Sequence, residues 1–209
     1  MMKKIKIVFM SAVIVIASCK PVSAAKNDNI KQLVKQLDEY ESSYIMANKI
    51  TENKKIKLTD KEKARAAALS ISLDKLKPCK KGEFGGYVTF KLKNELLKKA
   101  SVNIFGKKIS ASKLPKKHSK NWIISDAYRN KNNSFVYYTD AETEMDYAVK
   151  KNSIKKQNAD NYKVEKKFYF GYWGTNNGQP NYKITYNIKA NKKSDYGYVV
   201  KKIVLKKVK

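Results

Sequence analysis

Alternation of apolar and polar residues near the C-terminus constrains the fold of this chain most. In residues 182–189 every even position is Tyr or Ile, and every odd position is Lys, Thr or Asn. Residues 162–172 carry aromatic residues or Val at their even positions, interrupted only by Lys166. Because side chains of a strand point alternately to opposite faces, each run predicts a strand with one apolar and one wet face. This part of the chain therefore predicts half-buried antiparallel sheet.

A third run changes its phase in the middle. Tyr196, Tyr198 and Val200 share one parity, whereas Ile203 and Leu205 share the other. One extra residue in a strand flips the facing of everything that follows it. The switch near Lys201 therefore predicts a β-bulge.

Further strands precede these runs. Residues 122–128 and 134–139 flank a turn-like segment, 129–133, and an alternating run begins at Met145 and extends toward Ile154. Residues 158–161 favour a turn back into the next strand. Together with the C-terminal runs, these segments predict six strands in one meander that ends at Val208.

Three helices are expected before the strands. The apolar residues of 29–48 recur at spacings of three and four, which predicts an amphipathic helix. After a basic linker over 53–58, Thr59 and Glu62 match a capping box ahead of a helix reaching Leu76. In residues 88–105 apolar residues recur every four positions, and Gly106 follows where a left-handed terminator belongs. We expect this third helix to lie across the sheet.

Helices followed by an antiparallel meander define the α+β class. This element order, over roughly residues 60–208, resembles the cystatin-like or NTF2-like group. The resemblance implies a curved sheet wrapped around a long helix. The segment Phe170–Gly174 is also similar to strand ends in uncharacterised exported proteins of Gram-positive bacteria. A lipocalin-like closed barrel is the alternative fold, against which the preceding helices argue.

The N-terminus has the features of an export signal. Lysines precede an apolar run over 7–17, and Val22-Ser23-Ala24 offers small residues for cleavage before Ala25. Residues 16–19 also resemble a lipobox, in which Cys19 is lipidated, although the usual Leu is replaced by Ile16. We expect an exported protein in either case, with residues 1–24 as a signal peptide or 1–18 as a lipoprotein signal.

The remaining chain divides into two expected parts. Residues 25–58 comprise the first helix and the basic linker, and residues 59–209 form a single α+β domain. A chain of this length buries a sizeable core without a disulfide. None is available within it, because Cys79 is the only cysteine after Cys19.

The charge indicates the class of partner. The formal net charge is +28, and all of the 46 basic residues except Arg65 and Arg129 are lysines. Protein surfaces that recognise a nucleic-acid sequence favour arginine, whose planar guanidinium forms bidentate hydrogen bonds to guanine and phosphate. We therefore expect attraction to an anionic cell-wall polymer or a membrane surface, with a protein partner as a further possibility, and no specific nucleic-acid binding.

Catalytic and metal-binding residues are sparse. Cys79 and His118 are the only thiol and imidazole for a nucleophilic pair in the mature chain, and neither has the local signature of a cysteine protease. The acidic residues of 140–146 alternate in a manner that favours pairing with lysines over calcium or glycoside chemistry. The glycines of 82–86 lack the phosphate-loop pattern. We predict no catalytic residue, no metal and no cofactor.

Aromatic residues at one strand end form the predicted binding site. Tyr169 and Trp173 have the opposite parity to Phe168, Phe170 and Tyr172, and glycines flank them. If the even set faces the core, Tyr169 and Trp173 face solvent or a cleft. Exposed aromatic rings beside lysines suit stacking on sugars or gripping an anionic polymer. We predict that Tyr169, Tyr172 and Trp173 form this binding site.

These features predict a non-catalytic, exported and membrane-tethered binding or accessory protein of the cell envelope. Two other functions remain open: an exported hydrolase with a site in the sheet concavity, and a module that docks a partner protein through its loops.

Overall fold

Two antiparallel sheets with helices between them make up the described part of the chain. The computed structural model describes residues 22–48, 54–81, 88–118, 125–138, 145–172, 174–175 and 178–208. The helices are α1 (Val22–Lys35), α2 (Asp38–Asn48), α3 (Asp60–Leu69) and α4 (Asn94–Phe105), with short 3-10 turns η1 (Leu73–Lys75) and η2 (Ala111–Lys113). The α+β class predicted from the sequence is confirmed.

The larger sheet has five strands in the order β1-β9-β8-β7-β6. Its strands are β1 (Lys54–Ile56), β6 (Met145–Lys156), β7 (Asn161–Tyr172), β8 (Tyr182–Ala190) and β9 (Tyr198–Lys207). Every even residue from Tyr182 to Ile188 is buried, as the alternation predicts. The predicted bulge is also confirmed, because Asn187 pairs with Lys202 and Ile188 with Val200, which leaves Lys201 as the extra residue.

The smaller sheet has four strands in the order β2-β3-β5-β4. It comprises β2 (Lys77–Lys81), β3 (Val88–Lys91), β4 (Asp126–Asn130) and β5 (Asn133–Tyr138). The predicted hairpin between the last two is present, and Lys131 in its turn adopts a left-handed φ of 50°.

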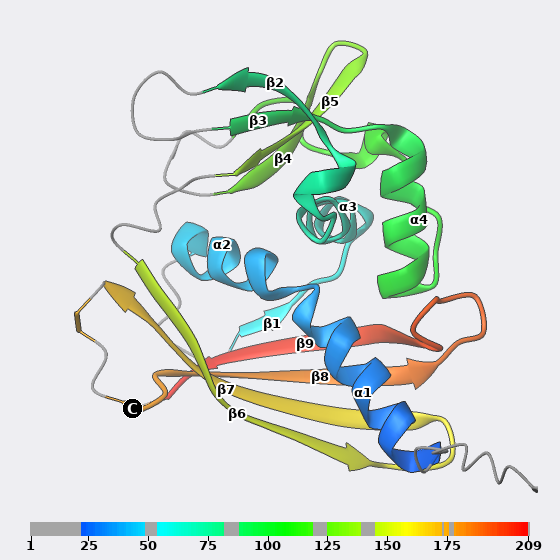
Figure 1. Cartoon of the computed structure of the whole chain (residues 1–209), viewed down its shortest axis with the longest axis vertical. Helices are drawn as coiled ribbons and strands as arrows, with labels where there is room; N and C mark the ends of the chain where they lie inside the picture. The colour runs from blue at the N-terminus through cyan, green and yellow to red at the C-terminus, as the bar shows by residue number, and fades with distance from the viewer. Residues whose placement is uncertain are drawn as a thin grey trace, which may run out of the picture.

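The helices occupy the space between the sheets (Figure 1). Helices α1 and α2 lie over one face of the larger sheet, and α3 lies beneath the smaller sheet, where it contacts β4. Helix α4 runs along the side of this layer and contacts α3 and β9. Among the described residues, the other face of the larger sheet is therefore free of helices.

The sequence patterns predicted the bounds of all three expected helices partly wrongly. The expected helix over 29–48 is two helices that begin at Val22 and Asp38, because the chain breaks at Gln36-Leu37. Acidic residues in the first turn of α2, including Asp38 and Glu41, favour a new helix start there. The apolar stripe continues through the break, so the period alone could not reveal it.

One of the two hydrogen bonds of the capping box predicted for α3 is present. The Thr59 hydroxyl accepts a hydrogen bond from the Glu62 amide at 3.2 Å, as predicted. The Glu62 carboxylate instead accepts from the Tyr40 hydroxyl on α2. The helix ends at Leu69 and not at Leu76, because the Ser70 hydroxyl donates to the Ala67 carbonyl and residues 73–75 form a separate 3-10 turn.

The expected third helix over 88–105 is a strand followed by a shorter helix. Residues 88–91 form β3, which pairs with β2 and β5, and α4 begins only at Asn94. Val88 and Phe90 favour a strand once a partner is present. The predicted terminator is confirmed, since Gly106 has a φ of 72°. The helices that cover the larger sheet are α1 and α2, not this one.

The predicted six-strand meander is divided between the sheets. Strands β6 to β9 form a meander, but the β4–β5 hairpin belongs to the smaller sheet. Residues 54–56, within the expected linker, form the edge strand β1 against β9. Both sheets are open, so the structure is not the closed barrel of the alternative prediction.

One cluster of buried apolar side chains joins both sheets to the helices. Its largest fully buried members include Tyr40 from α2, Leu97 from α4, and Phe168 and Tyr186 from the larger sheet. No helix in the described ranges is long and apolar enough to cross a membrane.

We predict that Gly106→Ala destabilises the protein more than Gly197→Ala does. Both glycines have a φ of 72°, a left-handed conformation that costs a residue with a Cβ about 1–2 kcal/mol. At Gly106 the new Cβ would also lie 2.5 Å from Asn191 Nδ2, and this side chain accepts a hydrogen bond from the Lys193 amide. At Gly197 nothing lies within 4 Å.

Denaturant unfolding of the two variants measures the difference. The expected loss is about 1–2 kcal/mol for Gly197→Ala and at least about 1 kcal/mol more for Gly106→Ala. Equal losses would show that contact with Asn191 does not restrain the end of α4.

Candidate functional site

A row of lysines crosses the helix-free face of the larger sheet. Lys151 of β6 pairs with Lys167 of β7, Lys167 pairs with Lys183 of β8, and Lys183 pairs with Lys206 of β9. Directly opposed residues on antiparallel strands have Cβ atoms about 4.5–5.5 Å apart. Four ammonium groups are therefore aligned across four neighbouring strands.

A second row runs parallel to the first. Lys155 pairs with Lys163, Lys163 with Asn187, and Asn187 with Lys202. Four residues along β7 separate the two rows, which corresponds to about 13 Å at the usual rise of a strand. We call these two sets together the lysine rows.

Glu165 is the one acidic residue between the lysine rows in the described sheet. Its carboxylate pairs with Lys183 at 3.0 Å and with Lys163 at 3.1 Å. Hydrogen bonds from Lys183 and then Lys163 hold the pKa of Glu165 below its ordinary value. One carboxylate cannot balance the seven lysines of the two rows. The face thus keeps a strong positive charge.

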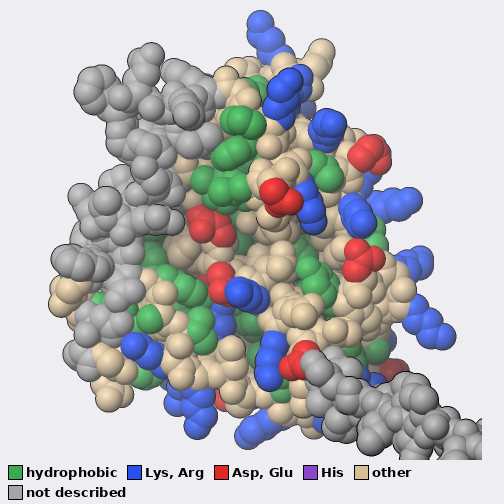
Figure 2. All heavy atoms as spheres, viewed as in Figure 1, with side chains coloured by type: hydrophobic (Ala, Val, Ile, Leu, Met, Phe, Trp, Pro, Cys, Tyr) green, Lys and Arg blue, Asp and Glu red, His purple; other side chains and the backbone are tan. Residues whose placement is uncertain are grey.

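Like charges placed directly opposite each other destabilise a sheet. Lys151, Lys167 and Lys206 are all exposed, so solvent weakens their mutual repulsion without removing it. Figure 2 shows Lys and Arg side chains along the lower margin of the molecule, below the larger sheet of Figure 1. Such an arrangement suits a surface whose charge an anionic partner neutralises.

The helix-covered face of the same sheet contains a buried ion pair. Lys166 is only 1% exposed, and its Nζ lies 2.6 Å from Asp38 Oδ1 and 2.5 Å from Glu41 Oε2, both on α2. The Tyr147 hydroxyl donates to the same Glu41 oxygen at 3.0 Å. The ammonium also lies over the rings of Tyr147 and Phe168, 5.3 and 5.5 Å from their centroids. These contacts explain how a lysine occupies an apolar position of β7.

Burial is the largest influence on the pKa of Glu41. Removal from water raises its pKa to about 7, although Lys166 opposes the shift. Its second oxygen, Oε1, has no hydrogen-bond partner within the described structure. Burial also raises the pKa of Tyr147, and the Glu41 and Asp38 carboxylates add to this, so the phenol stays a donor.

A second polar network joins α2, α3 and the smaller sheet. Arg65 Nε donates to Asp126 Oδ1 at 2.9 Å, and Arg65 Nη1 lies 3.6 Å from Glu62. The Tyr40 hydroxyl donates to the other Glu62 oxygen at 3.0 Å. Arg65, one of the two arginines of the chain, therefore connects α3 to the smaller sheet and is not presented to a partner.

The inner face of the larger sheet is filled. The side chains on this face, apart from Lys166, are mainly aromatic or aliphatic, and they belong to the same core as α1 and α2. This face is where the hydrolase alternative would place its site.

Of the three predicted aromatic residues, Tyr169 is the one whose side chain the structure describes. Tyr169 has the outward parity predicted, but it is only 6% exposed, because its ring folds over Gly171 and its hydroxyl bonds to that of Thr175. It therefore presents no free ring for stacking. The backbone of Tyr172 ends β7, but its side chain and Trp173 lie outside the described residues.

Cys79 and His118, the residues considered for a nucleophilic pair, contact different parts of the smaller sheet. The Cys79 thiol is exposed on β2 and donates to the Thr89 carbonyl at 3.0 Å. The His118 ring packs edge-on against Tyr137 and Tyr128, with centroids 4.4 and 5.3 Å away.

Other predicted residues lie beyond the described ranges. Cys19 is outside them, as are Asp140, Glu142 and Glu144, and only the backbone of Asp146 is described, in β6. Within the described ranges no group of three or more His, Cys, Asp or Glu residues could hold a metal ion.

Sequence reasoning missed the lysine rows and the buried ion pair. The rows depend on the register of four strands, which no single strand reveals. Lys166 did leave a signal, since it is the one charged residue at an apolar position of β7. Its partners on α2 are 125 or more residues away along the chain and could not be inferred.

Comparison with known proteins identifies no relative: no protein-family model, no curated protein and no solved structure matches the chain. Function must therefore be inferred from the geometry described above.

We predict that stability falls between pH 5 and pH 8 because of Glu41. Its pKa is about 7 when folded and about 4.5 when unfolded, so in this window the unfolded state releases a proton that the folded state retains. The contribution of Glu41 is thus most favourable below pH 4.5 and is lost as the pH rises to about 7. The loss amounts to at most about 3 kcal/mol.

Urea unfolding at pH 5 and pH 8, for the wild type and Glu41→Gln, tests this prediction. The Gln variant cannot titrate, so its stability should change less over the same window. The lowered pKa of Glu165 keeps that group ionised at both pH values. An identical pH dependence in the two proteins would contradict the assignment to Glu41.

Proposed function

We propose that this chain is an exported, membrane-tethered and non-catalytic binding protein of the cell envelope, and that its lysine rows bind an anionic polymer. The observation that carries the proposal is the alignment of Lys151, Lys167, Lys183 and Lys206 across four strands. Their repulsion is unfavourable in the free protein and is relieved when an extended polyanion lies along the row.

The chemistry of this face favours a polymer over a lipid surface. Membrane-surface binding commonly combines basic residues with apolar side chains that enter the headgroup boundary. Leu73 and Val149 are the only large hydrophobic residues described as exposed, and neither belongs to the lysine rows. Lysine, as a compact point charge, suits phosphate or carboxylate groups spaced along a flexible chain.

Export and tethering rest on the N-terminal sequence. The basic start, the apolar run and the lipobox-like segment ending at Cys19 support an exported protein held at the membrane. Kinship with the cystatin-like or NTF2-like group is part of the same proposal. A meander packed against helices supports it, and the second sheet is an addition to that pattern. Tyr172 and Trp173 remain the proposed source of ligand specificity.

We predict that replacing the four lysines of the first row by Gln abolishes most polyanion binding. Each lysine near an anionic surface contributes about 1 kcal/mol, so the quadruple variant should bind labelled polyphosphate roughly a hundredfold or more weakly. Wild-type affinity should fall steeply as the salt concentration rises. Fluorescence anisotropy over a salt series measures both effects.

The matched control removes the same charge elsewhere. Lys61, Lys108, Lys116 and Lys192 are exposed residues of helices and loops outside the rows. Their joint replacement by Gln should weaken binding far less. Equal losses in the two variants would mean that only net charge matters. Tighter binding to anionic vesicles than to polyphosphate, with the same dependence on the row, would assign the face to lipid.

A single charge reversal separates binding from stability. Lys167→Glu places a carboxylate between Lys151 and Lys183, and an opposite-charge cross-strand pair contributes about 0.2–1 kcal/mol. We expect the variant to unfold at a higher temperature than the wild type, by about 1 kcal/mol in stability, and to bind polyphosphate more weakly.

A lysine retained only for the fold would behave differently, because its replacement would lower stability. A decrease in the melting temperature of Lys167→Glu would therefore contradict the repulsion on which the proposal rests. Lys108→Glu, outside the rows, serves as the control for the change in net charge.

A further inference from the structure

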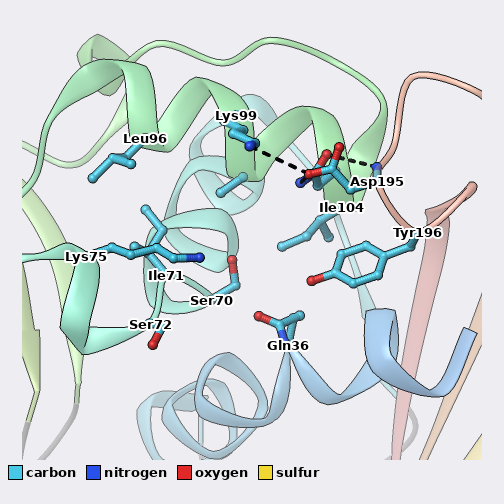
Figure 3. Close-up of a pocket in the computed structure, with 12 residues that line it drawn as sticks. Gln36, Ser70, Ile71, Ser72, Lys75, Leu96, Lys99, Ile104, Asp195 and Tyr196 are labelled. Carbon is cyan, nitrogen blue, oxygen red and sulfur yellow. Dashed lines mark hydrogen bonds and ion pairs between the residues drawn. The ribbon is translucent and has the colours of Figure 1, made fainter. Parts of the chain in front are cut away.

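A cavity of about 280 Å³ lies where the end of α1, the segment after α3, α4 and the β8–β9 loop meet (Figure 3). It is lined by Gln36 at the end of α1, by residues 70–75 after α3, by one side of α4, and by Asp195 and Tyr196 of the β8–β9 loop. The volume is near the lower end of that of small-molecule sites, about 300–1,000 Å³.

One part of the cavity wall is apolar. Leu96, Ala100 and Ile104 recur along one side of α4, and Ile71 contributes from the segment after α3. Ile71 and Ile104 belong to the buried core, so this wall is continuous with the interior of the protein. It offers a surface for a short hydrocarbon body.

Three polar side-chain ends point into the same space. Figure 3 shows the Lys75 ammonium, the Gln36 amide and the Tyr196 hydroxyl converging on the middle of the cavity. None of these three ends has a hydrogen-bond partner in the described part of the chain. Burial raises the pKa of Tyr196, so its hydroxyl is a donor at neutral pH. Convergent donors beside an apolar wall are the usual pattern of a ligand site.

Among the charged side chains that line the cavity, Lys75 is the one without an ion pair to a described residue. Lys99 Nζ lies 3.8 Å from Asp195 Oδ2, and the Asn103 amide donates to the same carboxylate at 2.8 Å. The neighbouring carboxylate of Asp74 accepts from the Ser72 hydroxyl. Lys75 has no such ion pair among the described residues. Asp195 at the rim disfavours a ligand with two negative charges, whereas a single anionic group matches the ammonium of Lys75.

We propose that this cavity binds a small amphiphilic carboxylate. The carboxylate accepts hydrogen bonds from the Lys75 ammonium and the Tyr196 hydroxyl, with the Gln36 amide alongside. The short apolar body lies against Leu96, Ala100 and Ile104. This site is separate from the lysine rows and does not depend on their proposed function.

Titration with hexanoate, followed by NMR of methyl-labelled protein, tests the proposal. Saturable shifts are expected at Leu96, Ala100 and Ile104, with a dissociation constant on the order of 1 mM for so small a ligand. Hexanol lacks the charge and hexylammonium reverses it, so both should bind at least about tenfold more weakly. Failure of hexanoate to shift these methyl groups, or equal binding of hexylammonium, would overturn the proposal.

Substitutions in the cavity test which side chains contribute to hexanoate binding. Lys75→Gln and Tyr196→Phe each remove a donor, and each should weaken hexanoate binding roughly tenfold. Ala100→Leu fills the cavity without changing any charge and should prevent binding. Lys113→Gln is the matched control for Lys75→Gln, because both lysines are exposed and end a 3-10 turn. Its binding should equal that of the wild type.

Thermal unfolding of each variant shows whether it is folded before the titration. Unchanged affinity in folded Lys75→Gln and Ala100→Leu would overturn the proposal. The quadruple variant of the first lysine row should bind hexanoate as the wild type does. Loss of hexanoate binding there would assign the shifts to general electrostatic attraction, which also overturns the proposal.

Discussion

The packing of the structure depends on the ion pair beneath α2. Lys166 points into the core from β7, and a buried charge costs several kcal/mol unless a partner compensates it. Asp38 and Glu41 provide that compensation from the first turn of α2. A different placement of α2 on the sheet would leave the ammonium unpaired. The pair therefore fixes the position of the helix layer over the larger sheet.

The placement of the helices decides which surfaces can bind a partner. With α1 and α2 on the inner face of the larger sheet, its side chains become part of the core. The outer face is left to solvent and carries the lysine rows. The second network attaches the smaller sheet to α3 through Arg65 and Asp126, and Glu62 of α3 accepts a hydrogen bond from Tyr40 of α2. The two surfaces at which we propose binding are therefore the outer face and the cavity beside α4.

The two proposed sites use lysine in different ways. On the open face, several exposed ammonium groups at regular spacing attract an extended polyanion, and salt screens them strongly. In the cavity, Lys75 acts singly, beside an apolar wall and two other donors, so shape and hydrogen bonds contribute along with charge. A protein with one surface of each kind could hold a polymer and respond to a small molecule independently.

The sequence by itself determined the local structure where the period and the end signals agree. The alternation of β8, the bulge at Lys201, the Thr59 cap and the Gly106 terminator are all as predicted. Only the tertiary structure decided the rest. Residues 88–91 became a strand because β5, over 40 residues later, supplied a partner. The lysine rows exist only through the register of four strands, and Lys166 is buried only because α2 brings carboxylates to it. Such pairings depend on residues distant in the chain, which a local pattern cannot specify.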